Sequence, residues 1–171
     1  MVEPIRVVAV LAANPALSSI LSAVLAATPN LRVRVFEAEG ALQTYMRLSP
    51  VDLLVCDFDN ETAPAGRLAH TLRLDGALAR REFQIIALAS TVTQNVKQAS
   101  IAGGIDEVIV KPMSPKYLLE RVLSRLKRPA PQVSAGRYQG PERRGHLPLS
   151  TTPVMAIHSP GGDNVVPLFR S

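Results

Sequence analysis

An aspartate and a lysine stand at the ends of two largely apolar segments of the sequence. Asp57 directly follows the stretch 51–56, and Lys111 directly follows the stretch 107–110. Both stretches are typical of strands buried in a parallel sheet, and the functional groups of such sheets collect at the carboxyl ends of the strands. A carboxylate and an ammonium group brought together there could form a salt bridge between two strand ends or a charged functional site.

The pattern of residues 1–128 predicts the elements that would position these two groups. Strands are expected at 6–11, 31–35, 51–56, 85–89 and 107–110. Apolar residues at helical spacing predict helices from 15 to about 28, and at about 40–48, 68–74, 94–102 and 115–126. Because strands and helices alternate, the fold class is α/β, a doubly wound five-stranded parallel sheet covered by helices on both faces.

Two of the expected helices carry clear start signals. Asn14 and Pro15 precede the apolar face of the first helix, and Ser114 and Pro115 precede that of the last. Asparagine and serine are preferred N-cap residues, and proline is favoured in the first helical position. The sequence therefore predicts that both helices begin at these prolines.

Composition changes after Arg128. Residues 129–171 hold 7 of the 14 prolines and 5 of the 10 glycines, with short apolar segments at 154–157 and 165–169. Such a composition does not build a core. We therefore predict a domain at 1–128 and a flexible or disordered tail at 129–171, whose apolar segments could dock on a sheet edge or groove.

Composition also argues against several classes of partner. A net charge of +5 with no tryptophan and few other aromatic residues does not favour nucleic acid. No apolar run approaches the length that spans a bilayer, and the N-terminus lacks the features of a secretion signal, so a cytoplasmic protein without membrane attachment is expected. The single cysteine, Cys56, lies in an apolar run and is interpreted as a small buried hydrophobic residue.

Three sequence segments resemble the receiver (CheY-like) domains of two-component response regulators. They are VDLLVCD at 51–57, IIALAS at 85–90 and GGIDEVIVKP at 103–112. The resemblance covers about the first three quarters of the chain. It implies that Asp57 is the candidate phosphoacceptor and that Lys111 is the lysine of the phosphoryl site.

The sequence departs from the receiver pattern where that pattern binds metal. Receivers carry two adjacent acidic residues at the end of the first strand, and this chain has Ala12 and Ala13. We therefore expect no bound cofactor, with Mg²⁺ binding only weakly, and Lys111 paired with Asp57 alone. The hydroxyl residue of the fourth strand is displaced to Ser90, which should point elsewhere unless the strand has already ended.

The leading functional hypothesis is a stand-alone pseudo-receiver in a two-component or phosphorelay system. It would act by binding a protein partner, such as a histidine kinase or a downstream signalling protein, through the last strand and its neighbouring helices. The alternative is a receiver that is phosphorylated on Asp57. A conventional enzyme is not expected, because no histidine clusters with a serine or cysteine nucleophile and there is no glycine-rich phosphate loop.

A third hypothesis concerns the tail. Residues 137–144 resemble the YxGPxRR-like segment that follows some alphaproteobacterial receivers. Arg143 and Arg144 could bind the phosphate or guanine edge of a second-messenger nucleotide while Tyr138 stacks on its base. The alternative interpretation of this segment is a solvated turn.

Overall fold

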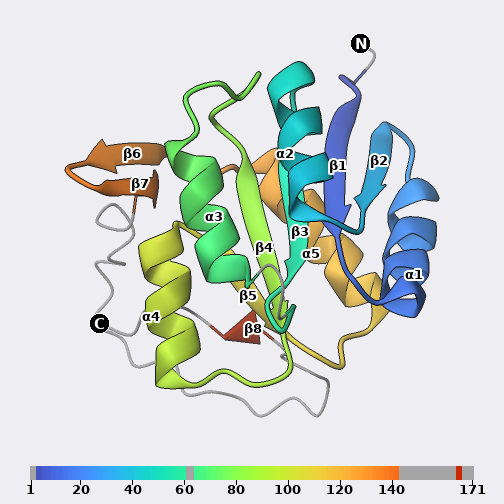
Figure 1. Ribbon diagram of the computed structural model, residues 1–171. Coiled ribbons are helices and arrows are strands. Elements are labelled where there is room, and N and C mark those ends of the chain that lie inside the picture. The colour runs from blue at the N-terminus through green and yellow to red at the C-terminus, as the bar shows by residue number, and fades with distance from the viewer. Residues whose placement is uncertain (1–2, 61–63, 143–164, 167–171) are drawn as a thin grey trace, which may run out of the picture.

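The computed structural model describes residues 3–60, 64–142 and 165–166, and it confirms the predicted α/β fold class (Figure 1). The five predicted strands are β1 (Arg6–Leu11), β2 (Leu31–Phe36), β3 (Leu53–Asp57), β4 (Gln84–Ala89) and β5 (Glu107–Val110). The five predicted helices are α1 (Pro15–Ala26), α2 (Glu39–Leu48), α3 (Ala65–Leu74), α4 (Gln94–Gly103) and α5 (Pro115–Lys127).

The five strands form one parallel sheet in the order β2-β1-β3-β4-β5. The strand β2 lies at one edge and shows the half-exposed pattern expected there. A two-residue strand, β8 (Val165–Val166), pairs antiparallel with β5 at the other edge. β8 falls within the apolar segment 165–169, so this described part of the predicted tail docks on a sheet edge.

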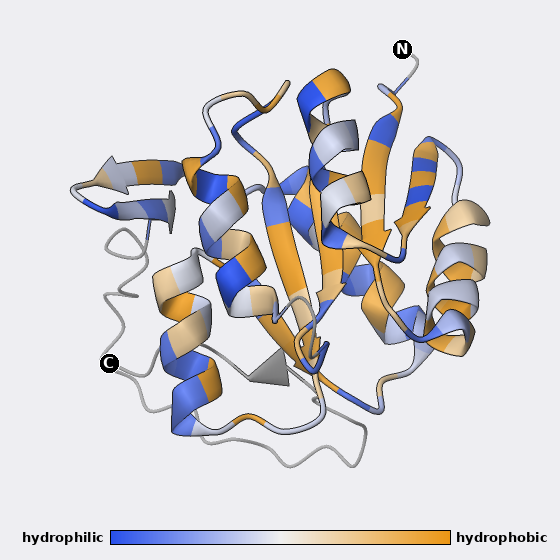
Figure 2. Ribbon diagram, in the orientation of Figure 1, coloured by the Kyte–Doolittle hydropathy of each residue, from blue (hydrophilic) through white to orange (hydrophobic). Residues whose placement is uncertain are grey.

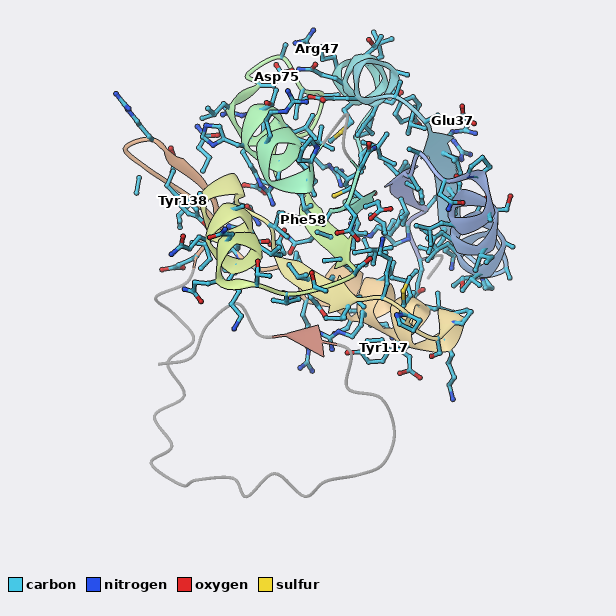
Figure 3. All side chains as sticks on the ribbon, turned by 60° about the horizontal axis from the view of Figure 1, so that its bottom comes forward. Glu37, Arg47, Phe58, Asp75, Tyr117 and Tyr138 are labelled. Atoms are coloured by element: carbon cyan, nitrogen blue, oxygen red, sulfur yellow. The ribbon has the colours of Figure 1, made fainter. Side chains whose placement is uncertain are left out.

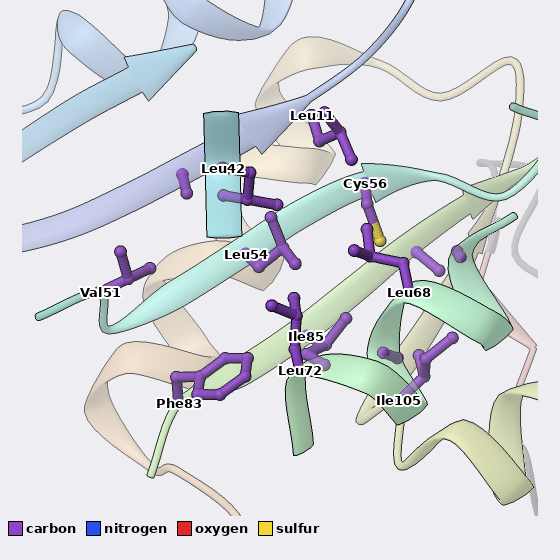
Figure 4. Packing of buried hydrophobic residues seen from close by; sticks show 14 of the residues in the cluster. Leu11, Leu42, Val51, Leu54, Cys56, Leu68, Leu72, Phe83, Ile85 and Ile105 are labelled. Atoms are coloured by element: carbon purple, nitrogen blue, oxygen red, sulfur yellow. The ribbon is translucent and has the colours of Figure 1, made fainter. Parts of the chain in front are cut away.

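Buried apolar residues fill both faces of the sheet, whose strands are the most hydrophobic part of the fold (Figure 2). Beneath α2, α3 and α4 the core contains Leu42, Leu68 and Phe83 (Figure 4). Beneath α1 and α5 it contains Leu21 and Leu118. Each such side chain stabilises the fold by roughly 1.5–3 kcal/mol when fully buried, so the two cores hold the strand ends in fixed positions.

The predicted start signals of α1 and α5 are present in the structure. The Asn14 side chain accepts hydrogen bonds from the backbone N–H groups of Ala16 and Leu17, at 2.9 and 3.3 Å. The Ser114 hydroxyl accepts one from the N–H of Tyr117 at 3.1 Å. None of the helices in the described part of the chain has both the length and the apolar character needed to cross a membrane.

Residues 129–142 differ from the flexible tail that their composition predicts. They form a hairpin of β6 (Gln132–Ala135) and β7 (Tyr138–Pro141), joined by a two-residue loop in which Gly136 has a φ of +60°. Glycine adopts this conformation without steric cost, as tight hairpin loops require. The packed part of the chain therefore extends past Arg128. The other residues of the predicted tail, 165–166 excepted, lie outside the described residues.

The hairpin docks beside α3 and α4 (Figure 1). The Gln84 side chain makes two hydrogen bonds with the backbone of Ala130. It donates to the Ala130 carbonyl at 3.3 Å and accepts from the Ala130 N–H at 3.1 Å. Gly140 lies so close to Gly104 that a Cβ on Gly140 would come within 2.7 Å of the Gly104 Cα. Docking on α3 and α4 supplies burial that the isolated segment lacks. Composition describes only the segment by itself, and for this reason it predicted disorder.

Candidate functional site

The carboxyl ends of β3, β4 and β5 position the candidate site. Asp57 is the last residue of β3 and lies in register with Leu88 of β4. Lys111 follows β5 directly, and its N–H donates to the carbonyl of Ala89 at 2.8 Å. Figure 3 brings this edge of the sheet forward, with Phe58 beside it. Parallel strands thus carry the two groups to the same edge, as the sequence predicted.

Lys111 pairs with two carboxylates. Its Nζ lies 2.8 Å from Asp57 Oδ1 and 2.9 Å from Asp59 Oδ2. The Asp59 N–H also donates to Asp57 Oδ1 at 3.1 Å, which turns the loop after β3 so that both carboxylates face the ammonium group. The expectation that Lys111 would pair with Asp57 alone is therefore wrong, because it overlooked the side chain of Asp59.

Ser90 completes the site. The strand β4 ends at Ala89, so the alternation of a strand no longer fixes the direction of Ser90. Its N–H and its hydroxyl both donate to Asp59 Oδ2, at 2.8 and 2.7 Å. The displaced serine therefore points into the site, which the sequence allowed only if the strand had ended.

The local charges are mutually stabilising. Partial burial disfavours the ammonium form of Lys111, but hydrogen bonds and charge attraction from Asp57 and Asp59 outweigh this and raise the pKa of Lys111 above its usual value. Partial burial likewise acts against ionised Asp59, yet hydrogen bonds from Ser90 and Lys111 lower the pKa of Asp59. Asp59 and Lys111 are therefore charged at neutral pH.

The position of the missing acidic pair offers no side-chain oxygen. Ala12 is buried and Ala13 is exposed at the end of β1. The neighbouring Asn14 uses its side-chain oxygen to cap α1. Among the described residues, no group of three or more histidine, cysteine or acidic side chains could hold a metal ion. Lys111 pairs with both Asp57 and Asp59, the two described carboxylates at the end of β3 and in the segment that follows it.

Cys56 lies outside this chemistry. It is buried in the core, and burial, with a contribution from the charge of Asp57, raises the pKa of its thiol to about 12. Because only the thiolate is strongly nucleophilic, the environment keeps this cysteine in its unreactive form.

Tyr138 lies far along the chain from these residues, in the hairpin. It is half-buried, and its hydroxyl donates to the carbonyl of Pro141 in the same strand at 3.0 Å. Its ring also covers Gly140, since a Cβ there would come within 2.6 Å of the Tyr138 hydroxyl oxygen. Arg143 and Arg144 lie outside the described residues, so nucleotide binding by this segment stays a prediction.

Comparison with known structures identifies the fold. A response regulator from Thermotoga maritima aligns with a TM-score of 0.61 and 20% identity, over 71% of this chain and 98% of its own. A putative response regulator from Chloroflexus aurantiacus J-10-fl gives a TM-score of 0.64 and 20% identity, over 74% and 100%. A CheY-like receiver domain protein from Methanospirillum hungatei JF-1 gives 0.64 and 16%, over 72% and 94%.

These similarities define the class of fold. The chain has the fold of response regulator receiver domains, which confirms the resemblance seen in its sequence. No protein-family model matches the sequence, and no curated protein matches it either.

Proposed function

We propose that this protein is a two-component signalling module of the pseudo-receiver type, which acts by binding a protein partner and not by taking up a phosphoryl group. One observation carries the proposal. Lys111 Nζ is hydrogen-bonded to both carboxylates of the site, at 2.8 and 2.9 Å, while Ala12 and Ala13 provide no ligand for a cation.

This arrangement of charges bears directly on whether Asp57 can take up a phosphoryl group. The reaction brings a highly charged anion to a carboxylate, and a divalent cation normally neutralises the developing charge. Mg²⁺ requires oxygen ligands in a near-octahedral arrangement and releases its waters reluctantly. One oxygen of Asp57 and one of Asp59 already accept from the ammonium group of Lys111, so a cation at these carboxylates would lie beside a positive charge. The residues present do not fit a Mg²⁺ site.

The partner in this proposal is a protein, for example a histidine kinase or a downstream signalling protein. The proposed contact surface comprises β5 and the helices α4 and α5 beside it. Pairing of β8 with Val108 and Ile109 supports this choice, because it means that the edge of β5 can accept an extended segment. The proposal includes no catalytic activity for the site.

The test compares the natural chain with the double variant Ala12→Asp/Ala13→Asp, which restores two carboxylates. We expect no saturable Mg²⁺ binding in the submillimolar range for the natural chain by calorimetry, and no labelling by acetyl phosphate. The double variant should gain Mg²⁺ affinity, because oxygen ligands are what the site lacks. Labelling of the natural chain that disappears in Asp57→Asn would overturn the proposal.

The alternative, a phosphorylatable receiver, is favoured by one observation. The hydroxyl of Ser90 lies at the same edge as Asp57 and Lys111, so the groups that would contact a phosphoryl group are still gathered. Partner binding discriminates between the two functions. A pseudo-receiver should bind its partner equally well as Asp57→Asn, whereas a phosphorylation-dependent receiver should lose binding together with labelling.

A further inference from the structure

Three donors from two different strand ends converge on a single oxygen atom. Asp59 Oδ2 accepts from the Ser90 hydroxyl at 2.7 Å, from the Ser90 N–H at 2.8 Å and from Lys111 Nζ at 2.9 Å. These distances are those of charge-assisted hydrogen bonds. A carboxylate oxygen has no capacity for further donors once these three are in place.

The donors directly follow buried strands, whereas the acceptor lies in a partly exposed loop. Ser90 and Lys111 directly follow the buried strands β4 and β5, and the N–H of Lys111 is held by the Ala89 carbonyl. Asp59 lies in the loop after β3, and its side chain is 39% exposed. The arrangement is therefore a preformed set of donors occupied by a side chain from a neighbouring loop.

We propose that the Asp59 carboxylate is the resident occupant of the Ser90 and Lys111 donors, which are the groups that would contact the phosphoryl group in a phosphorylatable receiver. This inference rests on the proposed function and adds to it the group that keeps the site closed. Because Asp59 is tethered two residues from Asp57, it binds without the entropy cost of capturing a free anion. Its charge also repels any external phosphate or carboxylate that approaches the same donors.

The occupied site links three strand ends. Asp59 follows β3, Ser90 follows β4 and Lys111 follows β5, so a single carboxylate joins the segments that leave these three strands. An anion that must be acquired from solution would create these links only while it is bound. In this protein the links are built into the chain, which gives the edge of the sheet one permanent arrangement.

Chemical rescue tests the proposal. Asp59→Ala removes the carboxylate, and formate supplies that group in free form to the vacated donors. We expect the amide resonance of Ser90 to move in Asp59→Ala and to return toward its natural position as formate saturates. The natural chain should show no such titration. In Asp59→Ala/Ser90→Ala, the Lys111 Nζ resonance should report about tenfold weaker formate binding, because the hydroxyl donor is gone.

Two further variants separate the effect from a loss of folding. Glu37→Ala removes an exposed carboxylate that follows β2, and its Ser90 amide should neither move nor respond to formate. Asp59→Asn keeps the size and an acceptor oxygen but no charge, so its Ser90 amide should move less than in Asp59→Ala. Thermal unfolding curves of all variants establish that each is folded.

The outcomes distinguish this inference from the proposed function. If the Ser90 amide of Asp59→Ala responds to formate no more than that of Glu37→Ala, the resident-anion proposal is overturned. That result leaves the proposed function in place, provided that acetyl phosphate does not label the natural chain. Labelling of the natural chain on Asp57 would instead overturn the proposed function, whatever the response to formate.

Discussion

The two ends of the sheet each hold a cation paired with aspartate, and the pairs differ in their exposure. At the carboxyl end, the side chains of Lys111 and Asp59 are 21% and 39% exposed. At the opposite end, Arg73 and Asp106 form a pair at 2.9 Å, with side chains only 3% and 0% exposed. The Lys111 pair is therefore partly exposed, whereas the Arg73 pair is buried in the interior.

The buried pair belongs to a larger network. The Arg73 guanidinium also donates to the carbonyls of Phe83 and Gly104, and it stacks over the Phe83 ring at 4.5 Å. Asp106 accepts from the Ile85 N–H at 2.7 Å and from Gln132 of the hairpin at 3.3 Å. Burial raises the pKa of Asp106, against the opposing charge of Arg73. Each of these side chains is a hydrogen-bonding or charged partner of another buried group. Through Gln132, the network also connects the hairpin to the sheet.

The difference in exposure predicts different effects on stability at the two ends of the sheet. Removing one partner of a buried pair leaves an uncompensated charge in the interior, which is costly, whereas an exposed pair contributes little to stability. Substitutions at the carboxyl end should therefore change recognition without unfolding the protein. Substitutions in the Arg73 network should change stability first.

The largest effect is expected for Arg73→Ala. It removes the partner of buried Asp106 and the donor to two backbone carbonyls. We expect a loss of about 3–5 kcal/mol in the free energy of unfolding, measured with urea. Arg67→Ala is the matched control on the same helix, because Arg67 is 63% exposed and pairs with Glu39 at 3.4 Å. The control should lose no more than about 1 kcal/mol. Equal losses in the two variants would contradict the expected difference between a buried and an exposed ion pair.

A smaller effect is expected for removing the hairpin. A chain ending at residue 128 lacks the segment whose Ala130 and Gln132 bond to Gln84 and Asp106. Compared with a chain ending at residue 142, it should be less stable by about 2–3 kcal/mol, since each lost hydrogen bond contributes roughly 1 kcal/mol. Both chains lack residues 143–171, so the difference in urea unfolding measures the hairpin alone. Equal stability would mean that docking adds nothing.

A still smaller effect is expected for Gly140→Ala. The new Cβ would lie 2.6 Å from the Tyr138 hydroxyl and 2.7 Å from the Gly104 Cα. Overpacking of this kind costs about 1–2 kcal/mol where the element can shift. Gly76→Ala is the control, because nothing lies within 4 Å of the added methyl group. Hydrogen exchange of the Glu142 amide, which donates to the Pro131 carbonyl, should accelerate only in Gly140→Ala.

The sequence predicted the sheet well and the hairpin not at all. Long apolar runs and apolar residues at helical spacing are local signals that each βα unit repeats, and caps such as Asn14 mark the start of some of the helices. The hairpin offers weaker signals, since β6 and β7 have four residues each and gain stability only by docking on α3 and α4. The turn-forming Gly136 between two short segments was the one local clue.

The site was predicted in part. Asp57 and Lys111 follow strands, so their convergence could be read from the sequence. Asp59 lies in a loop, where the direction of a side chain depends on tertiary contacts. The direction of the Ser90 side chain depends on the residue at which β4 ends, and strand boundaries are the least certain part of a sequence-based prediction.

The smallest expected effect concerns the pH dependence of the exposed site. The pKa of Asp59 is lowered from its usual 3.8 by hydrogen bonds from Ser90 and Lys111, which outweigh partial burial. The contribution of the ionised carboxylate to stability is therefore fully present above the unfolded-state pKa, and it is lost as the pH falls through the lower folded-state pKa. Asp59→Asn lacks this contribution at every pH.

We therefore expect the natural chain to exceed Asp59→Asn in stability by no more than about 1 kcal/mol at neutral pH, the scale of an exposed ion pair. Urea unfolding at a series of pH values should show this difference shrinking below pH 3.8. Glu37→Gln, which removes an exposed carboxylate at the same end of the sheet, should show a smaller difference throughout. A difference for Asp59→Asn that grows as the pH falls would mean that the carboxylate is strained in the site and not held by it, because protonation would then relieve a repulsion.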